Sequence, residues 1–129
     1  MKKLFISCPM KGRTEENIRN SMERMHDIAE LVFDQELEVI PTYIERIPPE
    51  TKNQSIWCLG ESIKMMAEAD YFIGVNFTRA FHGCDVERSV AVNYNIPYHL
   101  VDYRALMPDT AEIERLYLID MVFAQMNDK

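Results

Sequence analysis

The chain has 129 residues, of which 47% are hydrophobic and 27% are charged, a composition typical of one globular domain and not of a disordered segment. Its formal net charge of −7 argues against a general binder of nucleic-acid polymers, because no basic stripe is available to neutralise phosphates. No apolar run reaches membrane length and no signal peptide is recognisable, so we expect no membrane partner.

The cysteines and histidines form no metal-binding pattern. The three cysteines, at positions 8, 58 and 84, have no Cys-x-x-Cys spacing, and the three histidines add no ligand set to them. We therefore expect no metal, no cofactor and no disulfide. The odd cysteine count also favours a reducing, cytoplasmic location.

Apolar runs alternate with amphipathic ones along the chain, as in a parallel sheet with crossover helices. The first half predicts a strand at 2–7, a helix at 14–34, a short strand at Leu37–Ile40 and a long loop at Pro41–Asn53. The second half predicts a helix at 55–69, a strand at Tyr71–Val75, a helix at 84–94, a strand at Tyr98–Val101 and a last helix at 109–126.

These elements predict one α/β domain over residues 1–129, a flavodoxin-like or Rossmann-like three-layer sandwich with a parallel sheet of four to five strands. Right-handed crossovers with strand order 2-1-3-4 place the ends of the first and third strands side by side, at the switch point where such sheets bind ligands. The loop after the first strand and the segment after the third strand then share one crevice.

The loop after the first strand has the composition of an anion site. Ser7 ends the strand, and Cys8, Met10, Lys11, Gly12 and Arg13 follow it and lead into a helix start at Thr14-Glu15-Glu16. A strand, loop and helix in this order offer backbone N–H groups and a positive helix end to a phosphate. The alternative is that Lys11 and Arg13 are solvated loop cations.

The segment Gly83-Cys84-Asp85-Val86-Glu87 follows the third strand. It puts Glu87 about one turn into a predicted helix, where a carboxylate can act as nucleophile or general base. The alternative is a first-turn glutamate that only complements the helix dipole, worth roughly 0.3 to 1 kcal/mol.

At these residues the chain resembles the nucleoside 2-deoxyribosyltransferase superfamily, in particular its small bacterial and phage members. The resemblance covers roughly residues 3 to 101. It is carried by Ile6-Ser7-Cys8-Pro9-Met10-Lys11-Gly12, Trp57-Cys58-Leu59-Gly60, Ala67-Glu68-Ala69-Asp70 and Gly83-Cys84-Asp85-Val86-Glu87. It implies that Glu87 attacks C1′ of a deoxyribose and releases the base, and that water or a second base resolves the glycosyl ester.

The same resemblance implies the substrate contacts. The expected set around a nucleoside or nucleotide combines the first-loop residues with Ser62, Asn76, Gly83 and Asp85. Asp85 suits a sugar hydroxyl, although it equally suits the first helical turn as a dipole partner. Ser62 stands where characterised members place an aspartate against the base.

Three positions depart from the family pattern: Phe5 replaces a tyrosine that helps to orient the nucleophile, Ser62 replaces the aspartate, and Phe81 replaces a polar residue. These departures keep open an alternative, a catalytically silent protein that binds or sequesters a nucleotide. A third possibility is a cysteine-dependent phosphatase using Cys8 and Arg13, although their spacing is one residue too short and Pro9 removes a loop N–H donor.

The last predicted helix indicates self-association. It carries apolar residues on more than one face: Ile113, Leu116, Tyr117, Leu118, Ile119, Met121, Val122 and Phe123. One sheet face does not easily cover all of them, so we expect a homo-oligomer.

Overall fold

The computed structural model describes residues 1–10, 12–41, 49–76 and 81–102 of the chain. Seven elements follow one another in it: β1 (Lys2–Ile6), α1 (Glu15–Phe33), β2 (Leu37–Val39), α2 (Gln54–Met66), β3 (Tyr71–Val75), α3 (His82–Asn93) and β4 (Tyr98–Val101). The predicted last helix and the oligomer signal in it lie outside the described residues, as does Lys11.

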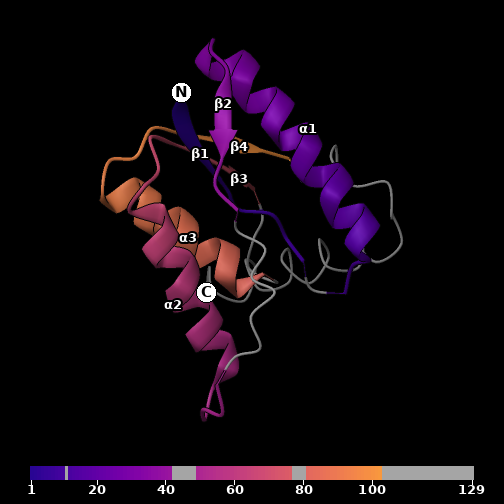
Figure 1. The fold of residues 1–129 in the computed structure, drawn as a ribbon, viewed down its shortest axis with the longest axis vertical. Helices are drawn as coiled ribbons and strands as arrows, with labels where there is room; N and C mark the ends of the chain where they lie inside the picture. Colours follow the sequence, from indigo (N-terminus) through magenta and orange to yellow (C-terminus); the bar gives the residue numbers. More distant parts are fainter. Residues whose placement is uncertain (11, 42–48, 77–80, 103–129) are drawn as a thin grey trace, which may run out of the picture.

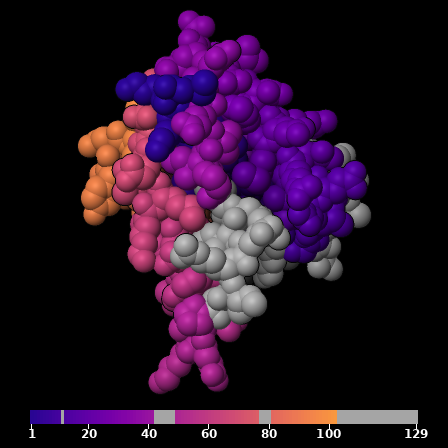
Figure 2. Space-filling model, in the orientation of Figure 1, coloured from indigo at the N-terminus to yellow at the C-terminus, as the bar shows by residue number. Residues whose placement is uncertain are grey.

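The four strands form one parallel sheet in the order β2-β1-β3-β4. This confirms the predicted α/β class and strand order. Helix α1 lies on one face of the sheet, and α2 and α3 lie together on the other (Figure 1). In the space-filling view, α1 forms one side of the molecule, and α2 with the residues before it extends from the lower end (Figure 2).

Strand alternation divides the core between the two faces of the sheet, because successive side chains on a strand point to opposite sides. Leu4 and Ile6 pack with Met25 and Ala29 of α1. Phe5 faces the other way, into a cluster that includes Met66, Phe72 and Ala91. The rings of Phe5 and Phe72 are stacked with centroids 5.8 Å apart.

The first helix begins and ends where its sequence predicts. Thr14 caps it, with its hydroxyl accepting a hydrogen bond from the backbone N–H of Asn17. Glu15 and Glu16 occupy the first turn, where they complement the helix dipole. The helix ends at Asp34, whose left-handed conformation stops it.

Two predicted helix boundaries are wrong by two or three residues. Helix α3 begins at His82 and not at Cys84, because Phe81 is buried against Cys84 and its carbonyl accepts a hydrogen bond from the N–H of Asp85. Helix α2 ends at Met66 and not at Ala69. Residues 67–69 instead donate to carbonyls three residues back, a tightening that is common at helix ends.

Candidate functional site

Glu87 lies on the buried side of α3. Cys84, Glu87 and Ala91 share that side, at the spacing of successive helical turns. Glu87 is only 9% exposed, which is unusual for a carboxylate, because burial takes its charge out of water. A glutamate that only complements the helix dipole would have no need of this burial, so the burial does not fit that alternative.

Ser7 contacts Glu87 from the end of β1. Its hydroxyl donates a hydrogen bond of 2.7 Å to Oε1 of Glu87, between residues 80 apart in sequence, and the contact is buried. The backbone N–H of Ser7 donates to the carbonyl of Ile73 at 2.9 Å. Ser7 and Glu87 thus meet where β1 and β3 end side by side, at the predicted switch point.

Burial raises the pKa of Glu87 from 4.5 to about 7, and side-chain hydrogen bonds from Ser7 and, less strongly, Ser62 moderate the increase. The carboxyl group is therefore about half ionised at neutral pH. A perturbed pKa of this kind at a strand end is typical of functional carboxylates, which must exchange protons near the working pH.

Cys84 lies close to the same pair. Burial raises the pKa of its thiol to about 12, against a smaller opposing effect of a side-chain hydrogen bond with Ser7. The thiol therefore keeps its proton at neutral pH and is a poor nucleophile. Cys84 therefore forms part of the buried surroundings of Ser7 and Glu87.

The first loop turns sharply before α1. The N–H of Arg13 donates to the carbonyl of Met10 at 3.1 Å, and Gly12 has a φ of 74°. A glycine is favoured there because other residues rarely adopt this left-handed conformation. Met10 packs against the core on the α1 side of the sheet. Met10 and Gly12 therefore have structural roles besides the predicted contact with substrate.

The guanidinium of Arg13 joins this loop to α1. It donates to the carbonyl of Pro9 at 2.8 Å, the carbonyl of Asn17 at 3.1 Å and the hydroxyl of Ser21 at 2.6 Å. Its Nη1 also lies 3.7 Å from the sulfur of Cys8, which is 5% exposed. These contacts hold the loop in shape, and binding of an anion by Arg13 stays a prediction.

The other predicted contacts lie around the same strand ends. Asn76 follows β3, and its N–H donates to the carbonyl of Val101 at 2.8 Å. Asp85 forms an ion pair with Arg88 on the outer part of α3. A Cβ added to Gly83 would meet, among described atoms, only Leu59 at 4.0 Å, so packing there does not require glycine. Ser62 is the predicted contact that the structure brings to Glu87 itself.

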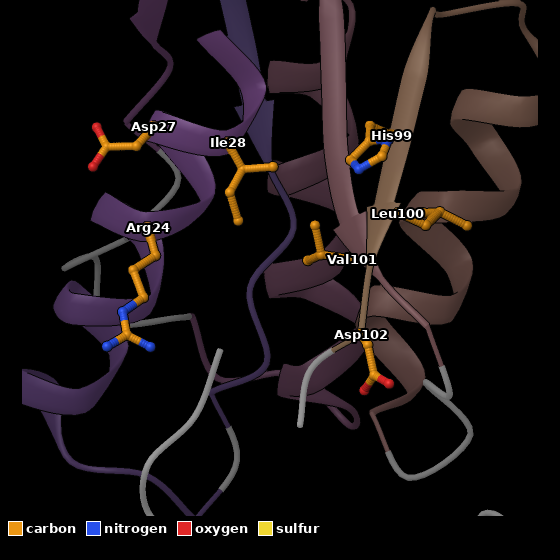
Figure 3. Close-up of a pocket in the computed structure, with 7 residues that line it drawn as sticks. All are labelled: Arg24, Asp27, Ile28, His99, Leu100, Val101 and Asp102. Carbon is orange, nitrogen blue, oxygen red and sulfur yellow. The ribbon is translucent and has the colours of Figure 1, made fainter. Parts of the chain in front are cut away.

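Two hollows lie on the α1 side of the sheet, away from Glu87. The larger, of about 530 Å³, lies between α1 and β4 (Figure 3). Its lining residues are Arg24, Asp27, Ile28, His99, Leu100, Val101 and Asp102. The smaller is lined by residues of α1, β1 and β2. Neither contains a predicted site residue.

Within the described ranges, no cluster of three or more histidine, cysteine or acidic side chains has the arrangement of a metal site. None of the described helices is both long and apolar enough to span a membrane. The chain matches no protein-family model, and the searches of curated proteins and of solved structures likewise find no match.

Proposed function

We propose that the protein cleaves the N-glycosidic bond of a nucleoside or nucleotide through Glu87, as a hydrolase or a deoxyribosyltransferase. The observation that carries the proposal is a buried glutamate, hydrogen-bonded to Ser7 at the carboxyl ends of β1 and β3. The resemblance of the surrounding motifs to the nucleoside 2-deoxyribosyltransferase superfamily supplies the substrate class. No cofactor or metal takes part in this scheme.

In the proposed reaction, an oxygen of the Glu87 carboxylate forms a bond to C1′ while the bond from C1′ to the base nitrogen breaks. The electron pair of that bond leaves with the base, which is protonated on release. Water then attacks C1′ and frees Glu87 in a hydrolase, whereas a second base does so in a transferase. The nucleophile must be ionised, so activity should rise with pH through about 7.

The matched pair Glu87→Gln and Glu68→Gln tests the nucleophile. Both variants exchange a carboxylate for an amide of similar size, and Glu68 is exposed. We expect the parent and Glu68→Gln to release free base from some member of a panel of ribonucleosides, deoxyribonucleosides and their monophosphates, measured by chromatography. Glu87→Gln should lose at least a hundredfold in rate, because an amide does not form the ester. Cleavage at the parent rate would exclude Glu87 as nucleophile.

A catalytically silent nucleotide binder is the second candidate, favoured by the position of Phe5. Phe5 has no hydroxyl to offer Glu87, and its ring is fully buried and stacked on Phe72. Tight binding of a nucleotide by calorimetry, with no free base from any member of the panel, would favour this candidate over the enzyme.

The first loop is proposed to hold a 5′-phosphate. Lys11→Ala is the cleaner variant for this test, because Arg13 also joins the loop to α1. We expect Lys11→Ala to weaken binding of a nucleoside monophosphate about fivefold or more and to leave the matching nucleoside nearly unchanged, since only the phosphate carries charge. Equal losses for both ligands in calorimetry would contradict a phosphate site.

The proposed setting is a cytoplasmic homo-oligomer. The odd count of three cysteines supports such a location, because they cannot all pair in disulfides within one chain. The proposed partners are a small nucleoside or nucleotide and further copies of the same chain.

A further inference from the structure

Ser7 holds a fixed place beside Glu87. Its backbone N–H is bonded to Ile73 of the neighbouring strand, so the main chain of Ser7 continues the ladder between β1 and β3. Strand alternation places its side chain on the same face as Phe5, the face covered by α2 and α3. Ser7 as a whole is 2% exposed, which leaves little of it for a ligand to contact.

The hydroxyl of Ser7 has one proton to donate and two polar side chains close to it. One is Oε1 of Glu87 at 2.7 Å, and the other is the thiol of Cys84. A thiol that keeps its own proton at neutral pH can donate weakly and has little power to accept. The proton of Ser7 is therefore directed to Glu87, where a hydrogen bond to a charged group is strongest.

We propose that Ser7 is a positioning residue for Glu87, whose hydroxyl orients the carboxylate for attack at C1′ and stabilises its ionised form, and that Ser7 is not a substrate contact. This proposal rests on the proposed function for the chemistry at C1′. The contact between Ser7 and Glu87 exists without substrate, so part of the proposal can be tested on the protein alone.

Several titratable or charged groups lie on the elements that meet at the Ser7–Glu87 pair. Helix α3 contributes the thiol of Cys84 and the ion pair of Asp85 with Arg88; the first loop contributes the thiol of Cys8 with Arg13 against it; helix α2 contributes Ser62, Cys58 and the ion pair of Glu61 with Lys64. Burial raises the pKa of Glu87, and the hydrogen bonds from Ser7 and Ser62 act against that increase. Removal of the Ser7 hydroxyl should therefore act directly on Glu87.

The experiment is a carboxyl ¹³C NMR titration of Glu87 in the parent, Ser7→Ala and Ser62→Ala, with the signal assigned by its loss in Glu87→Gln. We expect Ser7→Ala to lower the acid dissociation constant of Glu87 roughly tenfold, because a hydrogen bond to the ionised form is lost. Ser62→Ala should act in the same direction but less. Ser55→Ala, at an exposed position of α2, serves as the control and should change nothing.

Activity measurements distinguish a positioning role of Ser7 from a direct contact with substrate. For a positioning residue, the pH dependence of kcat/KM in Ser7→Ala moves to higher pH with the titration of Glu87, while KM changes little. An unchanged titration of Glu87 in Ser7→Ala would overturn the proposal, whether or not KM rises. If the protein cleaves no substrate, the proposed function fails, yet the titration still decides whether Ser7 stabilises the ionised carboxylate.

Ser7→Thr keeps the proposal testable if Ser7→Ala does not fold. It retains a hydroxyl at the same backbone position, so a folded Ser7→Thr protein should titrate like the parent. In that case Ser7→Cys supplies the loss of the hydroxyl, because its thiol of similar size donates only a weak hydrogen bond. An unchanged titration of Glu87 in a folded Ser7→Cys protein would overturn the proposal.

Discussion

Glu87 retains a proton at pH values where an exposed glutamate has released it. The cause is burial, which the hydroxyls of Ser7 and Ser62 offset only in part. A fully apolar cavity would keep the group neutral and useless as a nucleophile, whereas full exposure would surround it with water. The two hydroxyls allow the carboxyl group to ionise near neutral pH while it stays partly desolvated. This combination suits a nucleophile.

The raised pKa also makes stability depend on pH. Between about pH 4.5 and about pH 7 the folded protein holds a proton that the unfolded chain releases. The contribution of Glu87 to the free energy of unfolding is therefore complete below about pH 4.5 and is lost as the pH rises through about 7. The difference of the two pKa values sets a ceiling of about 3 kcal/mol on this loss.

Glu87→Gln should remove this dependence. Urea denaturation of the variant and the parent at pH 4.5 and pH 8 should show the variant gaining stability relative to the parent at the higher pH, by up to about 3 kcal/mol. Glu68→Gln, at an exposed position, should follow the parent. If the difference between Glu87→Gln and the parent is the same at both pH values, Glu87 does not titrate with a raised pKa.

At the scale of the elements, apolar periodicity predicted the strands better than the helix ends. Tyr71–Val75 and Tyr98–Val101 were predicted with the bounds that the structure has, because each is a short β-branched or aromatic run between turn residues. The start of α3 was missed because it depends on the packing of Phe81 on Cys84. That packing is a tertiary contact and has no signature in local periodicity.

Replacing Gly74 and Gly60 by alanine compares a tightly packed position with an open one. A Cβ at Gly74 in β3 would lie 2.8 Å from Cε1 of Phe72 and 3.3 Å from Cδ2 of Leu100. Phe72 is fully buried and stacked on Phe5, so it has little room to move. We expect Gly74→Ala to lower the free energy of unfolding by about 1 to 3 kcal/mol.

Gly60 lies inside α2, and a Cβ there would meet nothing within 4 Å. Gly60→Ala should therefore raise the free energy of unfolding by about 0.5 to 1 kcal/mol, because alanine favours the helix. Urea denaturation of both variants measures the two effects with the same exchange of side chains. Equal changes in the two variants would show that the packing of Phe72 does not constrain β3.

At the scale of the whole molecule, the strand order decides which residues meet. The alternation of strands and helices predicted the order 2-1-3-4, and this order brings the end of β1 beside the end of β3. The predicted strand order was therefore enough to expect that the end of β1 and Glu87 lie close together. The hydrogen bond from Ser7 and the proximity of Ser62 could not be predicted, because they depend on how far α2 and α3 sit from the strand ends.

Self-association is the last prediction, and it belongs to the whole molecule. The last predicted helix, at 109–126, carries more apolar residues than one sheet face covers. In the described part of the chain, Tyr98 is also exposed, at the start of β4, which is an outer strand of the described sheet. Light scattering at micromolar concentration should give a multiple of the 15.1 kDa chain mass. Leu118→Asp should reduce that mass if the last helix forms the contact, and Tyr98→Ser should do so if β4 forms it. A mass of one chain for the parent protein would contradict self-association.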